Sequence, residues 1–381
     1  MDRYARHRAI EGFSQEDLQA SRVAVIGAGA IGNEVVKNLC LLGVGTIDVY
    51  DFDTVELHNL TRSVLLREAD VGRSKAASVA QRAGELDPAV KVNPVEGDVW
   101  ETLRFADLGR YRCVIGALDN FEARLRVNQL CWIAGVDWIN AGIDSRYVTV
   151  ETFPFGSSPR ESSADLPACY ECGLPPSVYE RIAERYSCGG LQRAAARQRI
   201  VPTTTITASF AGAQAVNQAL RPRAKGRRWL LDSHGGLATT AALTRAESCP
   251  CCSDQPHAAR IVPLTTATAS AIDQAARAID ASSIRLSDPL IWECDCANCG
   301  RTDATRAVEL KRAGHVSDAI TFCMQCRSDA IRVQIRDDFD PGELSARYAP
   351  DATVPARFAL VGTTCLDLQS PPSTQHEEKP A

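Results

Sequence analysis

The sequence predicts an α/β fold, with a largely parallel sheet flanked by helices and a small cysteine-rich module toward the C-terminus. Short apolar runs alternate with helical patterns through the first half of the chain, which is typical of parallel sheets. A glycine-rich turn directly follows the first apolar run, and paired cysteines recur later in the chain. With 381 residues and 45% hydrophobic content, the chain can bury a full core.

The first predicted elements are a strand at residues 22–26 (RVAVI), a glycine turn, a helix and a strand at residues 46–50 (TIDVY). The turn has the pattern G-x-G-x-x-G, formed by Gly27, Gly29 and Gly32. Asp51 ends the second strand, nineteen residues after Gly32. This order is the first unit of a Rossmann-like fold, in which glycines let the backbone approach a phosphate and a helix N-terminus donates N–H groups.

The later elements continue the same alternation. A helix at residues 74–85 has Ser74 as its expected N-cap, and residues 147–153 alternate as a strand with one exposed face would. The cysteines that fall within helix or strand patterns are expected in the core: Cys40, Cys113 and Cys131. The other predicted strands lie at residues 90–94, 113–117, 138–141, 229–231 and 239–243, and the other helices at residues 125–134 and 205–220.

Three regions are expected along the chain. Residues 1–257 form the main domain, and residues 258–368 form the cysteine-rich module. Residues 369–381 are polar and Pro-rich, so we expect a disordered tail.

Composition excludes several classes of partner. The formal net charge is −5, from 42 basic and 47 acidic residues, so binding to a nucleic acid is not expected. No apolar run reaches the ~18 residues of a membrane helix and the N-terminus has no apolar signal core, so we expect a cytoplasmic protein with no membrane partner. Fifteen cysteines, ten of them in C-x-C or C-x-x-C clusters, then indicate metal binding rather than disulfides.

The residues after the second strand decide between two kinds of nucleotide. The glycine pattern and Asp51, which can accept hydrogen bonds from ribose, are by themselves typical of an NAD(P)-dependent dehydrogenase. However, Asp53, Asn59 and Arg62 follow closely, and Lys75 lies thirteen residues after Arg62. A dehydrogenase does not need an arginine and a lysine beside its phosphates, whereas the roughly four negative charges of a triphosphate need cations and Mg²⁺. The set therefore favours ATP with Mg²⁺.

This run resembles the ThiF/MoeB and ubiquitin-activating-enzyme-like family of adenylyltransferases. The family's hallmark is G-x-G-x-x-G, then D-x-D-x-V-x-x-x-N-L-x-R, a downstream Lys and an Asp after a later strand, and all four parts occur here in order. The family's N-terminal R-Y-x-R occurs at residues 3–6. The resemblance covers roughly residues 3–252 and departs at Ser63 and His7, where the family usually has Gln.

The resemblance implies a role for each candidate residue. Asp51 would bind ribose, and Asp119, after the strand at residues 113–117, would hold Mg²⁺ or orient the triphosphate. The residues that would contact phosphates are Asn59, Arg62 and Lys75. Arg6 would reach the phosphates of the other subunit, which implies a homodimer. These roles agree with the chemistry, because attack of a carboxylate on the α-phosphate brings two anions together and needs cations and a metal.

Two sets of cysteines have the spacing of zinc ligands. The first has 76 residues between its pairs, at the two places where the resembling family has such pairs: Cys169, Cys172, Cys249 and Cys252. The second has 23 residues between its pairs, as in a zinc ribbon: Cys296, Cys299, Cys323 and Cys326. Four thiolates match tetrahedral Zn²⁺ and leave no open position, so we expect two structural zinc ions. Cys251 and Cys294 are spare thiols, and each could replace a neighbour.

Cys188 is the candidate nucleophile. It lies outside both cysteine sets in the sequence Y-S-C-G-G, and P-T-T-T follows at residues 202–205. This arrangement looks most like bacterial enzymes that activate ubiquitin-like proteins, in which a cysteine of the crossover segment attacks the acyl-adenylate and forms a thioester. Nearby arginines would lower its pKa: Arg181, Arg185 and Arg193. The alternative is a plain loop cysteine.

Three functions are compatible with these features. The first is ATP-dependent adenylation of the C-terminal carboxylate of a ubiquitin-like (β-grasp) protein, followed by a thioester on Cys188 and transfer onward to a conjugating-type enzyme. The second is adenylation of a short precursor peptide or a sulfur-carrier protein. The third is a zinc-dependent binding protein with a vestigial ATP site, and the complete charge set argues against it. The C-terminal module is expected to dock the carrier or a downstream partner.

Overall fold

The computed structural model describes residues 3–156, 166–180, 202–221, 226–302, 323, 325–328 and 331–369. These residues divide into two compact units, one within 1–178 and 199–258 and the other within 179–198 and 259–381. None of the helices in the described ranges is both long enough and apolar enough to cross a membrane.

In the described part of the first unit, eight strands form one sheet in the order β3-β2-β1-β4-β5-β6-β7-β8. Neighbours from β3 to β5 pair in parallel, and the pairs from β5 to β8 are antiparallel. The predicted Rossmann-like, largely parallel sheet is therefore confirmed, with an antiparallel extension at one side. The strands are β1 (Arg22–Ile26), β2 (Thr46–Asp51), β3 (Lys91–Glu96), β4 (Cys113–Gly116), β5 (Trp138–Ile143), β6 (Tyr147–Phe153), β7 (Arg227–Asp232) and β8 (Leu237–Ala242).

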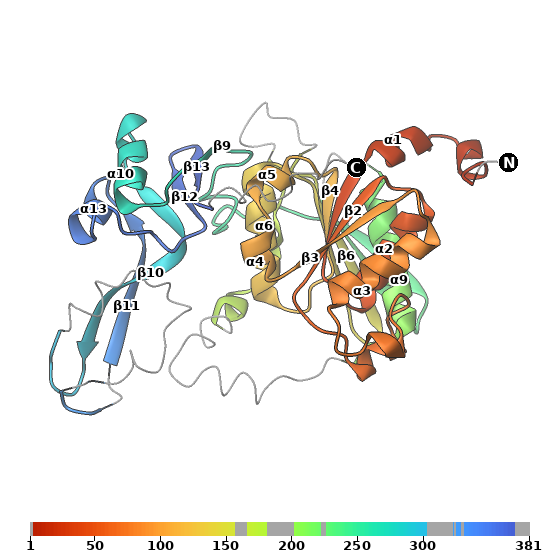
Figure 1. The fold of residues 1–381 in the computed structure, drawn as a ribbon, viewed down its shortest axis with the longest axis horizontal. Helices are drawn as coiled ribbons and strands as arrows, with labels where there is room; N and C mark the ends of the chain where they lie inside the picture. The colour runs from red at the N-terminus through yellow and green to blue at the C-terminus, as the bar shows by residue number, and fades with distance from the viewer. Residues whose placement is uncertain are drawn as a thin grey trace, which may run out of the picture. The chain divides into compact units, whose positions relative to one another are not determined.

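Helices cover both faces of this sheet, with α2, α3 and α9 on one face and α4, α5 and α6 on the other (Figure 1). Ser74 caps α3 as expected, because its side chain accepts a hydrogen bond from the backbone N–H of Ala77. The helical elements are η1 (His7–Ala9), α1 (Gln15–Ala20), α2 (Ala30–Leu41), η2 (Leu57–Thr61), η3 (Glu68–Asp70), α3 (Lys75–Leu86), α4 (Val99–Thr102), α5 (Phe105–Leu108), α6 (Phe121–Ala134), η5 (Tyr170–Gly173) and α9 (Thr205–Ala219).

The central strands are buried on both faces. Every residue of β4 and all but the first of β1 are buried, which explains their continuous apolar runs. The three cysteines predicted in the core are all buried, Cys113 in β4, Cys40 in α2 and Cys131 in α6. The one-sided exposure expected for β6 is wrong over its second half, where residues 150–153 are buried. The reason is that α9 packs on one face of β6, while Trp138 and Tyr170 pack against Phe153 on the other.

The order of the strands reverses beside β1. The chain passes from β1 to β2 on one side and later returns to place β4 on the other side of β1. In open α/β sheets, such a reversal leaves room for a ligand beyond the carboxyl ends of the strands. Gly27 follows β1, Asp51 ends β2 and Asp119 follows β4, so three predicted site residues lie at this edge.

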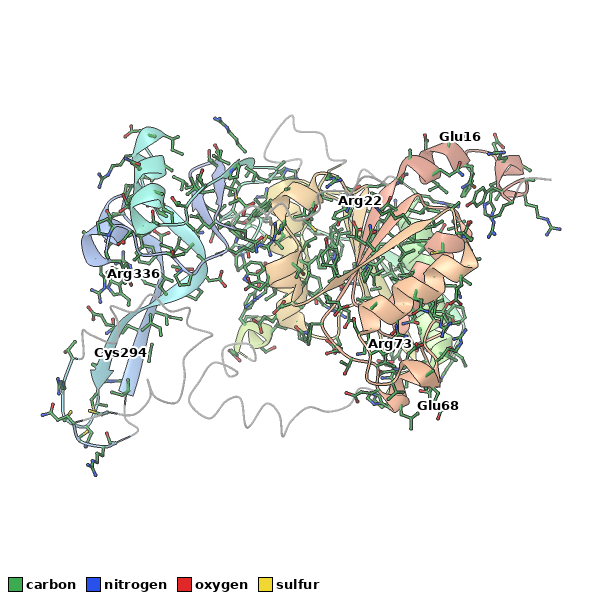
Figure 2. All side chains as sticks on the ribbon, viewed as in Figure 1. Glu16, Arg22, Glu68, Arg73, Cys294 and Arg336 are labelled. Atoms are coloured by element: carbon green, nitrogen blue, oxygen red, sulfur yellow. The ribbon has the colours of Figure 1, made fainter. Side chains whose placement is uncertain are left out.

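The second unit has its own sheet, in the order β11-β10-β12-β13-β9, and its own buried apolar cluster. Its strands β10 and β11 lead to the second cysteine set, as in the expected zinc-ribbon-like module. Arg336, labelled in Figure 2, donates two hydrogen bonds to Glu343, at 2.6 and 2.9 Å. The elements are β9 (Arg260–Pro263), α10 (Ala269–Ala278), β10 (Ile284–Cys296), β11 (Ile331–Phe339), α13 (Glu343–Arg347), β12 (Phe358–Val361) and β13 (Thr364–Asp367).

Candidate functional site

The glycine turn between β1 and α2 is shaped by close backbone contacts. Gly27 has a φ of +97°, and a Cβ there would lie 2.5 Å from the carbonyl oxygen of Ala117. A Cβ on Gly32 would lie 1.9 Å from the carbonyl oxygen of Gly27. By contrast, a Cβ on Gly29 would meet no described protein atom within 4 Å. Packing thus requires Gly27 and Gly32, whereas Gly29 keeps space open at the N-terminus of α2, where backbone N–H groups favour an anion.

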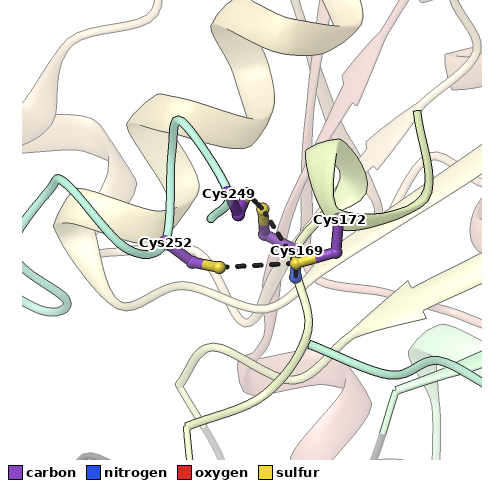
Figure 3. Close-up of side chains that lie close together, drawn as sticks. All are labelled: Cys169, Cys172, Cys249 and Cys252. Carbon is purple, nitrogen blue, oxygen red and sulfur yellow. Dashed lines mark hydrogen bonds between the residues drawn. The ribbon is translucent and has the colours of Figure 1, made fainter. Parts of the chain in front are cut away.

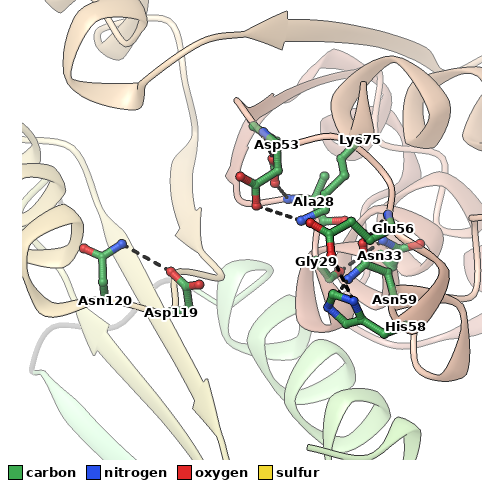
Figure 4. A network of polar contacts seen from close by, with 11 residues as sticks. Ala28, Gly29, Asn33, Asp53, Glu56, His58, Asn59, Lys75, Asp119 and Asn120 are labelled. Carbon is green, nitrogen blue, oxygen red and sulfur yellow. Dashed lines mark hydrogen bonds and ion pairs between the residues drawn. The ribbon is translucent and has the colours of Figure 1, made fainter. Parts of the chain in front are cut away.

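Acidic side chains join this turn to α3. The Asp51 carboxylate accepts hydrogen bonds from the backbone N–H groups of Ala28 at 2.6 Å and Asp53 at 2.8 Å. Burial raises the pKa of Asp51, and these two hydrogen bonds act in the opposite direction. Asp53 accepts a hydrogen bond from Lys75 Nζ at 2.7 Å, and the Lys75 side chain is only 12% exposed. Figure 4 shows this ion pair beside Ala28, so an ammonium group is held next to the glycine turn.

The short helix η2 is closed by its own side chains. Asn59 Oδ1 accepts a hydrogen bond from the backbone N–H of Glu56 at 2.9 Å, and the backbone N–H of Asn59 donates to Glu56 O at 2.9 Å. The Asn59 Nδ2 lies 3.1 Å from His58 Nε2, and His58 Nδ1 lies 3.0 Å from Glu56 (Figure 4). Arg62 donates a hydrogen bond to the His58 carbonyl at 3.1 Å. These contacts fix the amide of Asn59 and the guanidinium of Arg62, which come eight and eleven residues after Asp51 in the sequence.

Asp119 follows β4, the strand next to β1. Its carboxylate is exposed and accepts a hydrogen bond from Asn120 Nδ2 at 3.2 Å, and Asn120 caps α6. Figure 4 shows this pair apart from the group around Ala28. The nine predicted nucleotide-site residues therefore belong to three segments, which follow β1, end or follow β2, and follow β4: Gly27, Gly29, Gly32, Asp51, Asp53, Asn59, Arg62, Lys75 and Asp119.

Arg6 does not join this group. Tyr4 donates a hydrogen bond to Asp87 at 2.6 Å and lies so close to Gly43 that a Cβ there would be 2.5 Å from its ring. Gly43 comes after the C-terminal end of α2, whereas the glycine turn precedes its N-terminal end, and a helix of 12 residues is about 18 Å long. The exposed Arg6, two residues from Tyr4, is therefore held at the opposite edge of the sheet from its own nucleotide site.

Sequence reasoning missed two polar residues that contact segments of the site. Asn33 is fully buried and binds the glycine turn through its side chain. Arg124, near the start of α6, donates hydrogen bonds to the carbonyls of Leu118 at 2.5 Å and Ala141 at 3.4 Å, which ties the segment before Asp119 to β5. Their positions in the sequence were the available signal: Asn33 directly follows the last glycine of the turn, and Arg124 comes five residues after Asp119.

The first cysteine set comes together from η5 and the residue before it and from the loop after β8 (Figure 3). The Sγ atoms lie 3.4 Å apart for Cys169 and Cys249, 3.4 Å for Cys172 and Cys252, and 3.8 Å for Cys169 and Cys172. Four sulfurs around a zinc ion, each at about 2.3 Å, are about 3.8 Å apart, so this set fits the metal. Contact with Cys169 lowers the pKa of Cys252 to about 7, which favours the thiolate. The spare Cys251 is buried outside the set.

The second cysteine set lies where β10 ends and β11 begins. The Sγ atoms of Cys296 and Cys326 are 3.5 Å apart, and those of Cys299 and Cys323 are 3.7 Å apart. The Ser328 hydroxyl hydrogen-bonds to Cys326 and lowers its pKa to about 5. These distances also fit a tetrahedral zinc ion. The spare Cys294 is buried within β10, outside the set.

Cys188 and the three arginines predicted to lower its pKa lie outside the described residues, as do residues 370–381 of the expected tail. The nucleophilic role of Cys188 therefore stays a prediction.

Comparison with known proteins relates the first unit to one family. A profile described as the ThiF family matches residues 2–251. The SAMP-activating enzyme E1 of Haloferax volcanii is 34% identical over 178 residues, covering 46% of this chain and 62% of that protein. The adenylyltransferase and sulfurtransferase MOCS3 of Dictyostelium discoideum is 25% identical over 270 residues, covering 70% of this chain and 60% of that protein.

Among solved structures, E. coli MccB with AMPCPP and MccA aligns with a TM-score of 0.49 at 22% identity, over 62% of this chain and 68% of that one. The chain also spans less than two thirds of the length of each of the two relatives named above. Because the family profile matches more than half of the residues, including the whole glycine turn and the first cysteine set except Cys252, the chain belongs to the ThiF family.

Proposed function

We propose that this chain is an ATP-dependent adenylyltransferase that activates the C-terminal carboxylate of a ubiquitin-like protein. The proposal is supported by one arrangement: Lys75 pairs with Asp53 beside a glycine turn whose Gly29 has open space, and Asn59 and Arg62 belong to the segment between Asp53 and Lys75. Two cations, an amide and a helix N-terminus suit a triphosphate better than the two phosphates of a dinucleotide. The relatives named for SAMP activation and adenylyl transfer support the same class of reaction.

In the proposed first step, a carboxylate oxygen of the carrier attacks the α-phosphate of ATP. The bond from the α-phosphorus to the oxygen bridging it to the β-phosphate breaks, and pyrophosphate leaves with that electron pair. Asp51 would accept hydrogen bonds from the ribose, while Lys75 and Arg62 offset the negative charge that accumulates on the phosphates. Asp119 is an exposed carboxylate suited to Mg²⁺, which neutralises phosphate charge when bound.

In the proposed second step, the thiolate of Cys188 attacks the acyl carbon of the adenylate. The bond from this carbon to the AMP oxygen breaks, AMP leaves and a thioester forms. A thiol of a conjugating-type enzyme would then take over the acyl group by the same exchange. If the substrate is a short peptide or a sulfur carrier, only the first step is needed from this chain.

The proposed site is completed by a second subunit. Arg6 lies at the opposite edge of the sheet from its own glycine turn, so it can meet phosphates only in a partner. A two-fold symmetric dimer would give each site one such arginine, because both subunits present the same surface.

Each cysteine set is proposed to hold one structural Zn²⁺. All four sulfurs of each set lie within 4.8 Å of one another. A metal bound by four thiolates has no free position for substrate, so its contribution is to stability.

Carrier-dependent exchange of labelled pyrophosphate into ATP tests the first step. Candidate carriers are small β-grasp proteins that end in glycine, and short peptides serve as the alternative substrate. Exchange with a β-grasp protein supports the proposal, and exchange only with a peptide favours the alternative. Absence of exchange with either class would contradict adenylation.

Cys188→Ala is expected to keep carrier-dependent exchange and to lose the thioester, because adenylation precedes attack by the thiol. The thioester is measured as a carrier adduct on a non-reducing gel that disappears with reductant. Loss of exchange in a folded Cys188→Ala protein would show that the residue acts earlier than we propose.

A further inference from the structure

We propose that Asn33 is a positioning residue that couples the glycine turn to the segment carrying Arg62, and that this coupling sets the affinity for the triphosphate of ATP. The inference rests on the proposed function, since it assumes that both segments bind phosphates.

The Asn33 side chain joins two segments that are far apart in sequence. Its Nδ2 donates hydrogen bonds to the carbonyls of Ala28 at 2.6 Å and Gly29 at 3.0 Å. Its Oδ1 accepts a hydrogen bond from the backbone N–H of Leu65 at 2.8 Å, 32 residues along the chain. Leu65 comes three residues after Arg62, so one amide group binds both candidate phosphate-binding segments.

The chemistry of the amide allows it only one orientation. Carbonyls can be bound only by the NH₂ group, and the Leu65 N–H only by the oxygen, so a flipped amide would lose all three bonds. Asn33 is 0% exposed and lies on a helix face shared with the fully buried Val36. A buried amide among apolar side chains is costly unless its groups are paired, and here both its NH₂ and its oxygen are paired.

The hydrogen bond from Leu65 to Asn33 anchors the C-terminal end of the segment that carries Arg62. At the other end, the Asn59 side chain binds the backbone of Glu56 and closes η2. Arg62 therefore lies between two anchors, of which only Asn33 also binds the glycine turn. Without this bridge, the turn and Arg62 could shift relative to each other. A misplacement of about 1 Å can lower the rate of a reaction that depends on geometry about 100-fold.

The adenosine part of the ligand would be less affected. Asp51, the expected ribose ligand, accepts hydrogen bonds from the backbone N–H groups of Ala28 and Asp53; Asn33 binds Ala28 only at its carbonyl, and the bond from Asp53 is independent of it. Loss of the bridge should therefore weaken binding of the phosphates much more than binding of adenosine.

The test compares Asn33→Ala with the wild-type chain. Affinity for a non-hydrolysable ATP analogue with Mg²⁺ is measured by calorimetry, and affinity for adenosine by NMR titration. We expect the variant to bind the ATP analogue about 10- to 100-fold more weakly and adenosine within about threefold of wild type. Asn33→Ser keeps a shorter polar group and should lose less affinity for the ATP analogue, again with little change for adenosine. This variant replaces Asn33→Ala in the test if Asn33→Ala does not fold.

Asn128→Ala is the matched control. Asn128 is also 0% exposed, and its Oδ1 accepts a hydrogen bond from the backbone N–H of Tyr170 at 3.0 Å, away from the glycine turn. This variant should lose stability but keep wild-type affinity for both ligands. Equal affinity of the folded Asn33 variants and wild type for the ATP analogue would overturn the proposal, as would equal losses for the analogue and adenosine. A wild-type chain that does not bind the ATP analogue would instead refute the proposed function on which the inference rests.

Discussion

The glycines of the turn between β1 and α2 have different surroundings, although the sequence pattern treats them alike. Gly27 and Gly32 approach other backbone atoms so closely that any side chain would collide with them. Gly29 has φ −76° and ψ −156°, a conformation open to other residues, and free space around its missing Cβ. Neither backbone conformation nor contact with the described residues therefore requires glycine here, and the proposed ligand would.

Gly29→Ala is expected to keep the fold and to weaken ATP binding about tenfold or more, because the added methyl group occupies the space of a phosphate. The free energy of unfolding, from urea denaturation, should stay within about 1 kcal/mol of wild type. Gly84→Ala, in α3, is the control, since a Cβ there also meets no described atom within 4 Å. It should leave ATP affinity unchanged, and an equal effect of both substitutions would refute the assignment.

Buried thiols make the fold sensitive to alkali. Burial raises the pKa of Cys40 and of Cys113 to about 12, from an ordinary value of 9.0. Above pH 9 the unfolded chain releases these protons while the folded chain retains them, so stability falls as pH rises from 9 toward 12. Each thiol should cost about 1.4 kcal/mol of unfolding free energy between pH 8 and pH 10.

Denaturation under reducing conditions at both pH values tests this effect. Cys40→Ala should be less stable at pH 8 because of the cavity, yet its stability should fall less steeply toward pH 10 than that of wild type. Identical pH slopes for variant and wild type would show that Cys40 ionises normally in the folded chain.

At the scale of elements, the first cysteine set joins segments that the sheet alone leaves unconnected. Cys169 and Cys172 follow β6, whereas Cys249 and Cys252 follow β8, about 80 residues later. Hydrogen bonds attach both segments to α6, from the Tyr170 backbone N–H to Asn128 and from Trp132 to Gln255 O. A metal at this point would hold the antiparallel extension of the sheet to its parallel part.

Zinc content tests the ligand set. Wild type should contain two zinc ions per chain, and Cys252→Ser should contain one and unfold at a lower temperature, because metal-binding energy is lost from folding. Cys251→Ser should retain both ions, since Cys251 lies outside the set. Loss of zinc from Cys251→Ser but not from Cys252→Ser, measured by mass spectrometry of the metal, would reverse the assignment.

At the scale of the whole molecule, the position of Arg6 is the reason we propose a site shared by two chains. Tyr4 and Arg3 attach the N-terminal segment to residues at the end of α3, through Asp87 and the Leu86 carbonyl. This attachment holds Arg6 away from its own glycine turn and fixes its direction toward solvent or a partner.

Mixing two inactive variants tests action across the dimer. Arg6→Ala and Lys75→Ala should each lose most exchange activity, but co-expressed chains should recover about a quarter of the wild-type rate, because half of the dimers are mixed and each has one complete site. If Arg6 acted within its own chain, the mixture would stay inactive. Mixing Lys75→Ala with Arg62→Ala is the control, because both residues belong to the same site and no complete site can form.

The local order of the fold could be predicted from sequence. Apolar runs, the glycine turn and the Ser74 cap depend on residues a few positions apart, so β1, β2 and α3 were predicted close to their observed bounds and a helix was expected where α2 lies. For the second unit, the paired cysteines were predicted but most strands were not, because short strands such as β12 and β13 form a core only through long-range pairing. The two-sided burial of β6 likewise depends on packing that no periodicity reveals.

By itself, the sequence determined which groups this chain has for binding a nucleotide and metal ions, because residue type and spacing decide charge, ligand chemistry and local turns. Only the tertiary structure decided which of them meet. It brought Asp119 to the edge of the sheet that bears the glycine turn, placed Cys252 rather than Cys251 in the first set, and moved Arg6 out of its own site. It also joined Asn33 to Leu65. These contacts join residues 32 to more than 80 positions apart, and such distances are closed by the packing of helices on a twisted sheet rather than by any local pattern.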